Sequence, residues 1–229
     1  MIGQALTNSP RIATIKLNHL QQHLQQIYQV EVALDVDDFL VTDPTLLRQM
    51  EHNGERETKE KLLVLEEGEE LNIALYLDAE VMSLLGRDDP IVQLHDGNLP
   101  QYLLALEGVS HFLYLTYHAA CSRGISLFEL ELQAEIDKYV TTAALLSRQH
   151  GGRVPVQLHQ WLFEKPRFDE RLRGAQLERY RDANRYAGKY CLALERRYPK
   201  DKRGAGLSTE LIHFYRLSRG EKIRRIDHG

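Results

Sequence analysis

The sequence predicts an α+β protein, with a small three-stranded antiparallel sheet and short helices at the N-terminus, followed by a predominantly helical bundle. Two observations support this division. Before residue 78, three segments alternate apolar with polar residues or flank a turn, as strands with one buried face require. From residue 99 onward, apolar residues recur at helical spacing. We divide the chain into residues 1–95 and 96–229, and expect both parts to form one continuous unit.

The N-terminal part is predicted to contain three strands and three helices. A first helix is expected to end near residue 28, and the alternating residues 30–36 form the first predicted strand. Asp43 and Pro44 are typical of a helix start, because aspartate caps the first turn and proline fits its first position. Residues 62–66 and 71–77 flank a Glu-Gly-Glu turn and predict a hairpin, which a short helix at residues 79–85 follows.

The C-terminal part is predicted to contain helices alone. Residues 99–123 and 126–148 have long apolar patterns on either side of Gly124, which is typical of an antiparallel helical hairpin. A long basic helix is expected at residues 170–198. Ser208 is the predicted N-cap of a last helix, which continues brokenly past Gly220.

Charge is strongly segregated along the chain. The first 164 residues contain 11 lysines and arginines against 24 aspartates and glutamates, whereas the last 65 contain 18 against 9. A formal net charge of −13 therefore precedes one of +9, which the total of −4 conceals. Such segregation favours either attraction between the two parts or a basic part that binds an acidic partner.

The basic segment from residue 165 supplies the predicted partner-binding surface. The preferred hypothesis is a cytoplasmic, non-catalytic binding or regulatory protein, whose basic helix contacts an acidic protein surface within the same chain or in a homo-oligomer. Nucleic acid is the alternative partner, because cations interleave with tyrosines that can stack on bases. The tail adds Arg219, Lys222, Arg224 and Arg225. The predicted partner-binding residues are Arg179, Arg181, Arg185, Lys189, Arg196 and Arg197.

A second hypothesis is a metal-dependent enzyme with its site inside the helical bundle. At 100° per residue, Glu107, His111 and His118 fall on one line of the first long helix. Glu131 and Glu135 form an acidic stripe on the next helix, and facing helices with such ligands can hold a divalent transition metal, iron or zinc. The spacing leaves open whether these residues enclose a pocket or form a solvated face.

Several function classes lack their sequence signals. The chain has no Gly-rich phosphate loop, no Gly-x-Ser-x-Gly elbow and no His-Glu-x-x-His helix, which favours binding over catalysis. No window reaches about 18 apolar residues and the N-terminus does not resemble a secretory signal, so no membrane partner is expected. Cys121 and Cys191 stand alone and are expected to be reduced and buried.

Overall fold

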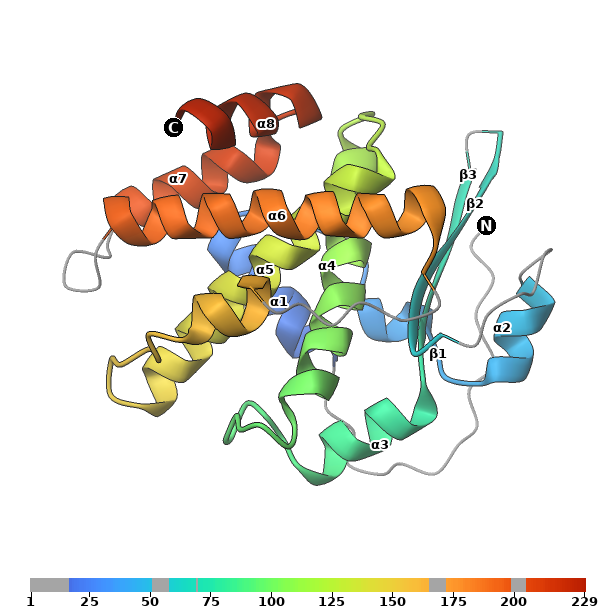
Figure 1. Cartoon of the computed structure of the whole chain (residues 1–229). Coiled ribbons are helices and arrows are strands. Elements are labelled where there is room, and N and C mark those ends of the chain that lie inside the picture. Colours follow the sequence, from blue (N-terminus) through green and yellow to red (C-terminus); the bar gives the residue numbers. More distant parts are fainter. Residues whose placement is uncertain (1–16, 51–57, 69, 165–171, 199–204) are drawn as a thin grey trace.

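A computed structural model describes residues 17–50, 58–68, 70–164, 172–198 and 205–229 (Figure 1). It confirms the α+β class, with a small sheet at one side of a helical bundle. The elements in chain order are α1 (Leu17–Tyr28), η1 (Val36–Phe39), β1 (Leu40–Val41), α2 (Pro44–Met50), β2 (Glu60–Glu67), β3 (Glu70–Leu77), α3 (Ala79–Arg87), α4 (Leu99–Ala120), α5 (Leu127–Gln149), η2 (Gln160–Glu164), α6 (Gly174–Arg197), α7 (Ala205–Arg216) and α8 (Arg219–His228).

The sheet is mixed, which corrects the prediction of an antiparallel one. Its strand order is β1-β3-β2, so β3 lies in the middle. β2 and β3 form the predicted antiparallel hairpin, with Gly68 at a φ of +66° that favours glycine. β1 pairs parallel with β3 through Leu40 and Leu75. A two-residue strand at the far edge leaves no periodic pattern for the sequence to reveal.

Residues 30–36 do not form the predicted strand. Gln21 of α1 takes the place of a strand neighbour, because its amide donates to the carbonyl of Leu34 at 2.7 Å and accepts from the N–H of Val36 at 2.8 Å. Asp35 then caps the short 3-10 helix η1. Leu34 is 37% exposed while Val36 is fully buried, so the alternation does not define a single buried face.

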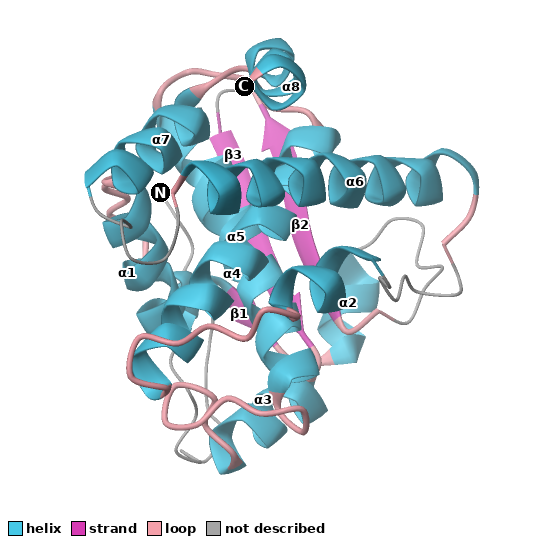
Figure 2. Ribbon diagram, turned by 60° about the vertical axis from the view of Figure 1, so that its left-hand side comes forward, coloured by secondary structure: helices cyan, strands magenta, loops and turns pink. Residues whose placement is uncertain are grey.

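Helix α4 is the centre of the molecule. It contacts α1, α3 and α5, and also β2 and β3 of the sheet (Figures 1 and 2). A helix that is apolar nearly all round is stable only when other elements cover it. One hydrophobic core runs through the described residues from Leu17 of α1 to Ile226 of α8, and therefore draws on both halves of the chain.

The hairpin between α4 and α5 forms as predicted, but with a different turn. Ser122, not Gly124, takes the left-handed conformation, with a φ of 53°. Ser126 and Glu129 form a reciprocal capping box that starts α5. Cys121 is exposed at the end of α4, contrary to expectation, whereas Cys191 is buried; both are free thiols.

The last three helices cover the hairpin. In Figure 1, α6 crosses over α5, and α7 and α8 lie beyond it at the C-terminal end of the chain. Helix α7 begins at Ala205, so Ser208 lies inside the helix and is not its N-cap, while Ser218 caps α8. Among the described helices, none combines the length and apolar character needed to cross a membrane.

Candidate functional site

Four ionisable side chains meet where the sheet packs against the helical hairpin. Glu107 and His111 lie one turn apart on α4, Glu131 lies on α5, and Glu60 begins β2. We name these four residues the Glu–His cluster. Potential ligand atoms of Glu107, His111 and Glu131 all lie within 4.8 Å of one another. The side chains of Glu60, His111 and Glu131 are 8–9% exposed, so the cluster is almost closed to solvent.

Glu60 reaches the cluster because α4 carries a glycine where the sheet crosses it. A Cβ atom at Gly108 would stand 2.8 Å from Cδ1 of Leu75 and 3.2 Å from Oε1 of Glu60. Glycine in a helix interior costs roughly 1 kcal/mol relative to alanine. Here Gly108 allows the sheet to lie directly on α4, next to Glu107, the residue that precedes the glycine.

The His111 ring lies between two carboxylates without a close hydrogen bond to either. Its Nδ1 is 3.5 Å from Oε1 of Glu60, and its Nε2 is 3.6 Å from Oε2 of Glu131. Both distances exceed the roughly 2.7–3.2 Å of N–H···O hydrogen bonds. Among the described residues, Nε2 of His111 and Oε1 of Glu60 are buried and have no hydrogen-bond partner. Unpaired buried polar atoms of this kind are uncommon.

The cluster favours positive charge. Burial by itself would lower the pKa of His111, but the Glu131 and Glu60 carboxylates on either side raise it well above its ordinary value. Burial raises the pKa of Glu60, although His111 opposes this shift. Both directions mean that removing a cation from between these carboxylates is unfavourable.

A lysine extends the cluster along the interface between α4 and α5. The Lys138 ammonium donates to Oε2 of Glu107 at 3.1 Å and also to Oε1 of Glu135. The second oxygen of Glu135 accepts from the amide of Asn184 at 3.0 Å. Burial opposes the charge of Lys138, but Glu107 and Glu135 raise its pKa above the ordinary value. Glu107 therefore belongs both to the cluster and to the lysine pair.

Helix α6 closes the outer side of this region. Nε of Arg179 lies 3.8 Å from Oε1 of Glu131 and has no hydrogen-bond partner among the described residues. Burial and then the carboxylates of Glu131, Glu107 and Glu60 raise the pKa of the neighbouring Tyr180 hydroxyl. The N-terminal half of α6 is thus drawn against the acidic cluster.

His118, the second histidine predicted for the site, lies elsewhere. It is seven residues beyond His111, which is about 10 Å along the helix axis. Its Nδ1 is 3.2 Å from Nη1 of Arg123, and its ring packs against Tyr114 and Tyr215. Burial, followed by Arg123, lowers the pKa of His118 to about 4. His111 and His118 therefore share an angular position around α4 but lie at different positions along its axis.

A second buried polar group lies where α8 meets α5. Lys222 is completely buried, and its ammonium donates to the side-chain oxygen of Gln133 at 2.6 Å. Gln133 donates in turn to Asp137 at 2.8 Å, which also accepts from Ser110 and Tyr28. Lys222 is therefore not part of an exposed basic tail, as its position in the sequence had suggested.

The basic side chains of α6 beyond Arg179 face solvent. Several form ion pairs with acidic residues of the same C-terminal segment, such as Lys189 with Asp227 at 2.7 Å. Arg185 pairs with Asp182 one turn away at 2.9 Å, so both ion pairs stay within the C-terminal segment. Arg179 instead links the helix to Glu131 in the acidic part of the chain. The exposed residues are Arg181, Arg185, Lys189, Arg196 and Arg197.

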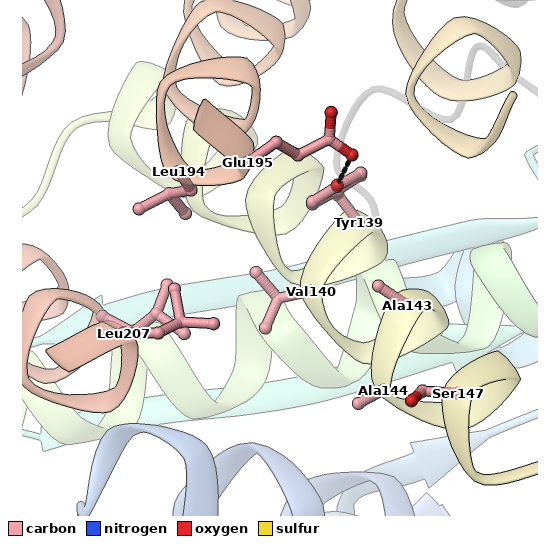
Figure 3. Close-up of a pocket in the computed structure, with 9 residues that line it drawn as sticks. Tyr139, Val140, Ala143, Ala144, Ser147, Leu194, Glu195 and Leu207 are labelled. Carbon is pink, nitrogen blue, oxygen red and sulfur yellow. Dashed lines mark hydrogen bonds between the residues drawn. The ribbon is translucent and has the colours of Figure 1, made fainter. Parts of the chain in front are cut away.

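An apolar hollow of about 190 Å³ lies between α5, α6 and α7 (Figure 3). Val140 and Leu207 contribute to its walls, and the Tyr139 hydroxyl donates to the Glu195 carboxylate beside it (Figure 3). The hollow does not include the Glu–His cluster. Its lining offers mainly methyl groups, so it lacks the converging polar atoms of a metal site.

The sequence did not indicate three residues that shape the cluster. Glu60 precedes the predicted strand at residues 62–66, and Lys138 lies on a helix with many charges, so neither had a distinguishing spacing. Gly108 interrupts an apolar helix, which is a signal for close packing but does not identify the element that approaches. The chain matches no known family model, no curated protein and no solved structure.

Proposed function

We propose that this protein binds one divalent transition-metal ion at the Glu–His cluster. The ligands are Glu107, Glu131 and Nε2 of His111, and Glu60 accepts the Nδ1–H of the histidine. The observation that carries the proposal is Nε2 of His111, which is buried without a hydrogen-bond partner among the described residues and faces Glu131. Histidines that bind metals commonly donate their second N–H to a carboxylate, and Glu60 stands 3.5 Å from Nδ1.

The spacing of the ligand atoms supports this proposal. Carboxylate oxygens and imidazole nitrogens bind transition metals at about 2.0–2.2 Å, so two ligands of one ion lie at most about 4.4 Å apart. One potential ligand atom from each of Glu107, His111 and Glu131 lies within 4.8 Å of the other two. A contraction of a few tenths of an ångström, by rotation of glutamate side chains, is enough to surround an ion.

The local charge also supports a divalent ion. When all four are ionised, the carboxylates of Glu60, Glu131, Glu107 and Glu135 carry four negative charges. Lys138 and Arg179 supply two positive charges at contact distances. A divalent ion beside a neutral histidine balances the remaining two, whereas a protonated histidine balances one. Buried charges require such compensation.

Two carboxylates and one imidazole suit iron(II), manganese(II) or zinc. Three protein ligands leave coordination positions for water, and a metal ion lowers the pKa of a bound water toward neutrality. Activation of water for a hydrolytic reaction is the chemistry that such an ion supplies. Because the cluster is almost closed, metal binding itself is the function that we assign.

Metal analysis of untagged protein tests the proposal. Protein expressed with added iron, manganese or zinc and then dialysed is expected to retain about one ion per chain. Glu131→Gln is expected to lower this occupancy at least tenfold, because the amide keeps the shape but removes the charge. Glu80→Gln on α3 is the control, because its carboxylate is exposed and lies outside the cluster, and this variant is expected to retain the ion.

Either of two results would overturn the proposal. The first is a folded wild-type protein that takes up no iron, manganese or zinc during expression or on titration with the free ion. The second is equal occupancy in the wild type and in Glu131→Gln. Circular dichroism of each variant establishes that the comparison is made between folded proteins.

A second candidate function is the binding of an acidic protein surface by α6. Arg181, Arg185 and Lys189 are exposed at intervals of four residues, which places them along one face of the helix. We propose that this face is available to a partner because its visible ion pairs are exposed, and exposed pairs contribute only about 0–1 kcal/mol.

Charge reversal tests this second candidate. Binding of an oligoglutamate peptide is expected to be lost when Arg181, Arg185 and Lys189 are all changed to Glu. The control for net charge changes Arg48, Arg87 and Arg153 to Glu together, because these three residues are exposed outside α6 and alter the charge by the same amount. Tighter binding of a single-stranded oligonucleotide, with a steep loss of affinity between low and high salt, would point to nucleic acid as the partner instead.

A further inference from the structure

The Lys138 ammonium lies among carboxylates that could equally bind a metal cation. It lies between carboxylates of two helices, Glu107 on α4 and Glu135 on α5. The Lys138 side chain is 13% exposed, and those of Glu107 and Glu135 are 16% and 13% exposed, so all three are largely removed from solvent. Asn184 of α6 holds the other oxygen of Glu135 and fixes its orientation.

Glu107 connects this place to the Glu–His cluster. One of its oxygens accepts from Lys138 at 3.1 Å, and a ligand atom of the same side chain lies within 4.8 Å of those of His111 and Glu131. A carboxylate that contacts two neighbouring cations is the bridging element of two-metal sites, whose ions stand about 3.5–4 Å apart. Glu131 and Glu135, four residues apart, present one carboxylate to each place.

We infer that the Lys138 ammonium stands as a built-in second cation in a two-cation carboxylate cluster, so that the protein holds one metal ion where the same carboxylates would otherwise hold two. This inference rests on the proposed function, because it assigns the first place to a metal. Without Lys138, the carboxylates of Glu107 and Glu135 would lack a cation and would form a second, adjacent metal site.

The consequence concerns the reactions open to the protein. Two adjacent metal ions can clamp the attacking and leaving oxygens of a substrate from both sides. A single ion beside an ammonium retains Lewis acidity and water activation but lacks that second open coordination sphere. Lys138 is therefore a residue that determines stoichiometry, and it acts through Glu107 rather than by contact with a reacting atom.

Titration of the full chain with manganese(II) tests the inference. Lys138→Ser removes the ammonium and leaves space for an ion and its water, so the bound manganese is expected to rise from one to two ions per chain. The electron paramagnetic resonance spectrum is expected to change from that of an isolated ion to that of a coupled pair. Lys138→Arg keeps the charge in place and is expected to bind one ion, as the wild type does.

If the serine variant does not fold, Lys138→Asn replaces it in the experiment. The asparagine amide can still hydrogen-bond to the buried carboxylates. One ion in the wild type and one ion in the folded serine or asparagine variant overturns this inference and leaves the proposed function intact. No ion in the wild type overturns both. Two separate, uncoupled ions in the variant also count against it, because the second ion would then lie outside the shared Glu107 site.

Discussion

Lys222 is predicted to make stability depend on pH, and Lys222→Met is the perturbation that reveals it. The ammonium is fully buried and lies 4.6 Å from the ring centroid of Tyr114 and 4.8 Å from that of Phe214. Its hydrogen bond to Gln133 compensates only part of the lost hydration. Methionine has a similar length and no charge, so it fills the same space.

The magnitude follows from the pKa of Lys222. Burial lowers it from 10.5 to about 7, while Asp137 and Glu129 oppose the shift and Arg123 adds to it. Above pH 7 the folded chain releases this proton, whereas the unfolded chain keeps it to about pH 10.5. The free energy of unfolding therefore rises with pH across that window, by at most about 1.4 kcal/mol per pH unit.

Urea denaturation followed by circular dichroism at pH 7, 8 and 9 measures the effect. Between pH 7 and 9 the wild type is expected to gain about 2–3 kcal/mol relative to Lys222→Met. Cys191 is also buried, with a raised pKa, and opposes the gain at the upper limit, but it does so in both proteins. Lys189→Met, which removes an exposed ammonium, is the control and is expected to follow the wild type.

Parallel pH dependence in the wild type and in Lys222→Met would refute the reasoning. It would mean that water or a local opening of α8 hydrates the ammonium, so that the folded and unfolded states bind the proton equally well. Amide hydrogen exchange at α8 would then show fast exchange, in contrast to the slow exchange expected of a helix that is anchored through a buried side chain.

Three further predictions concern other parts of the fold. Gly108→Ala is expected to lower the free energy of unfolding by about 1–3 kcal/mol, because its methyl group would overlap Leu75; thermal denaturation measures this loss. The same methyl group would push Glu60 away from the cluster, and metal titration measures that effect. Ser126→Ala removes the capping box of α5 and is expected to cost about 1 kcal/mol in urea denaturation. Burial raises the pKa of Asp137 from 3.8 to about 6, so the wild type is expected to lose about 3 kcal/mol of stability relative to Asp137→Asn as pH rises through that window, which urea denaturation at several pH values measures.

The long helices were predictable because their information is local. Apolar residues at helical spacing identify α4 and α5, and Ser126 marks the start of α5 by a hydrogen bond within its own first turn. The hairpin of β2 and β3 was predictable for the same reason, since Gly68 supplies the turn between two segments of strand pattern.

Two of the errors have a different cause: a contact with a distant part of the chain decided the local structure. Residues 30–36 alternate like a strand, but the side chain of Gln21 satisfies their backbone and no strand forms. Lys222 reads as part of a basic tail, yet α8 turns it into the core beside Gln133. Neither outcome can be read from the spacing of residues, because the partner lies 13 to 89 residues away.

The candidate site also has a part that was predictable from local sequence and a part that was not. The sequence by itself determined that Glu107 and His111 share one face of a helix and that Glu131 and Glu135 share another, because helical geometry fixes those angles. Tertiary packing alone decided that Glu131 lies beside His111 and not beside His118. The point along each axis at which two helices cross is set by the side chains between them. Packing also brought Glu60 over Gly108 and placed Lys138 between two carboxylates, because a strand and a helix can meet only where the surface between them leaves room.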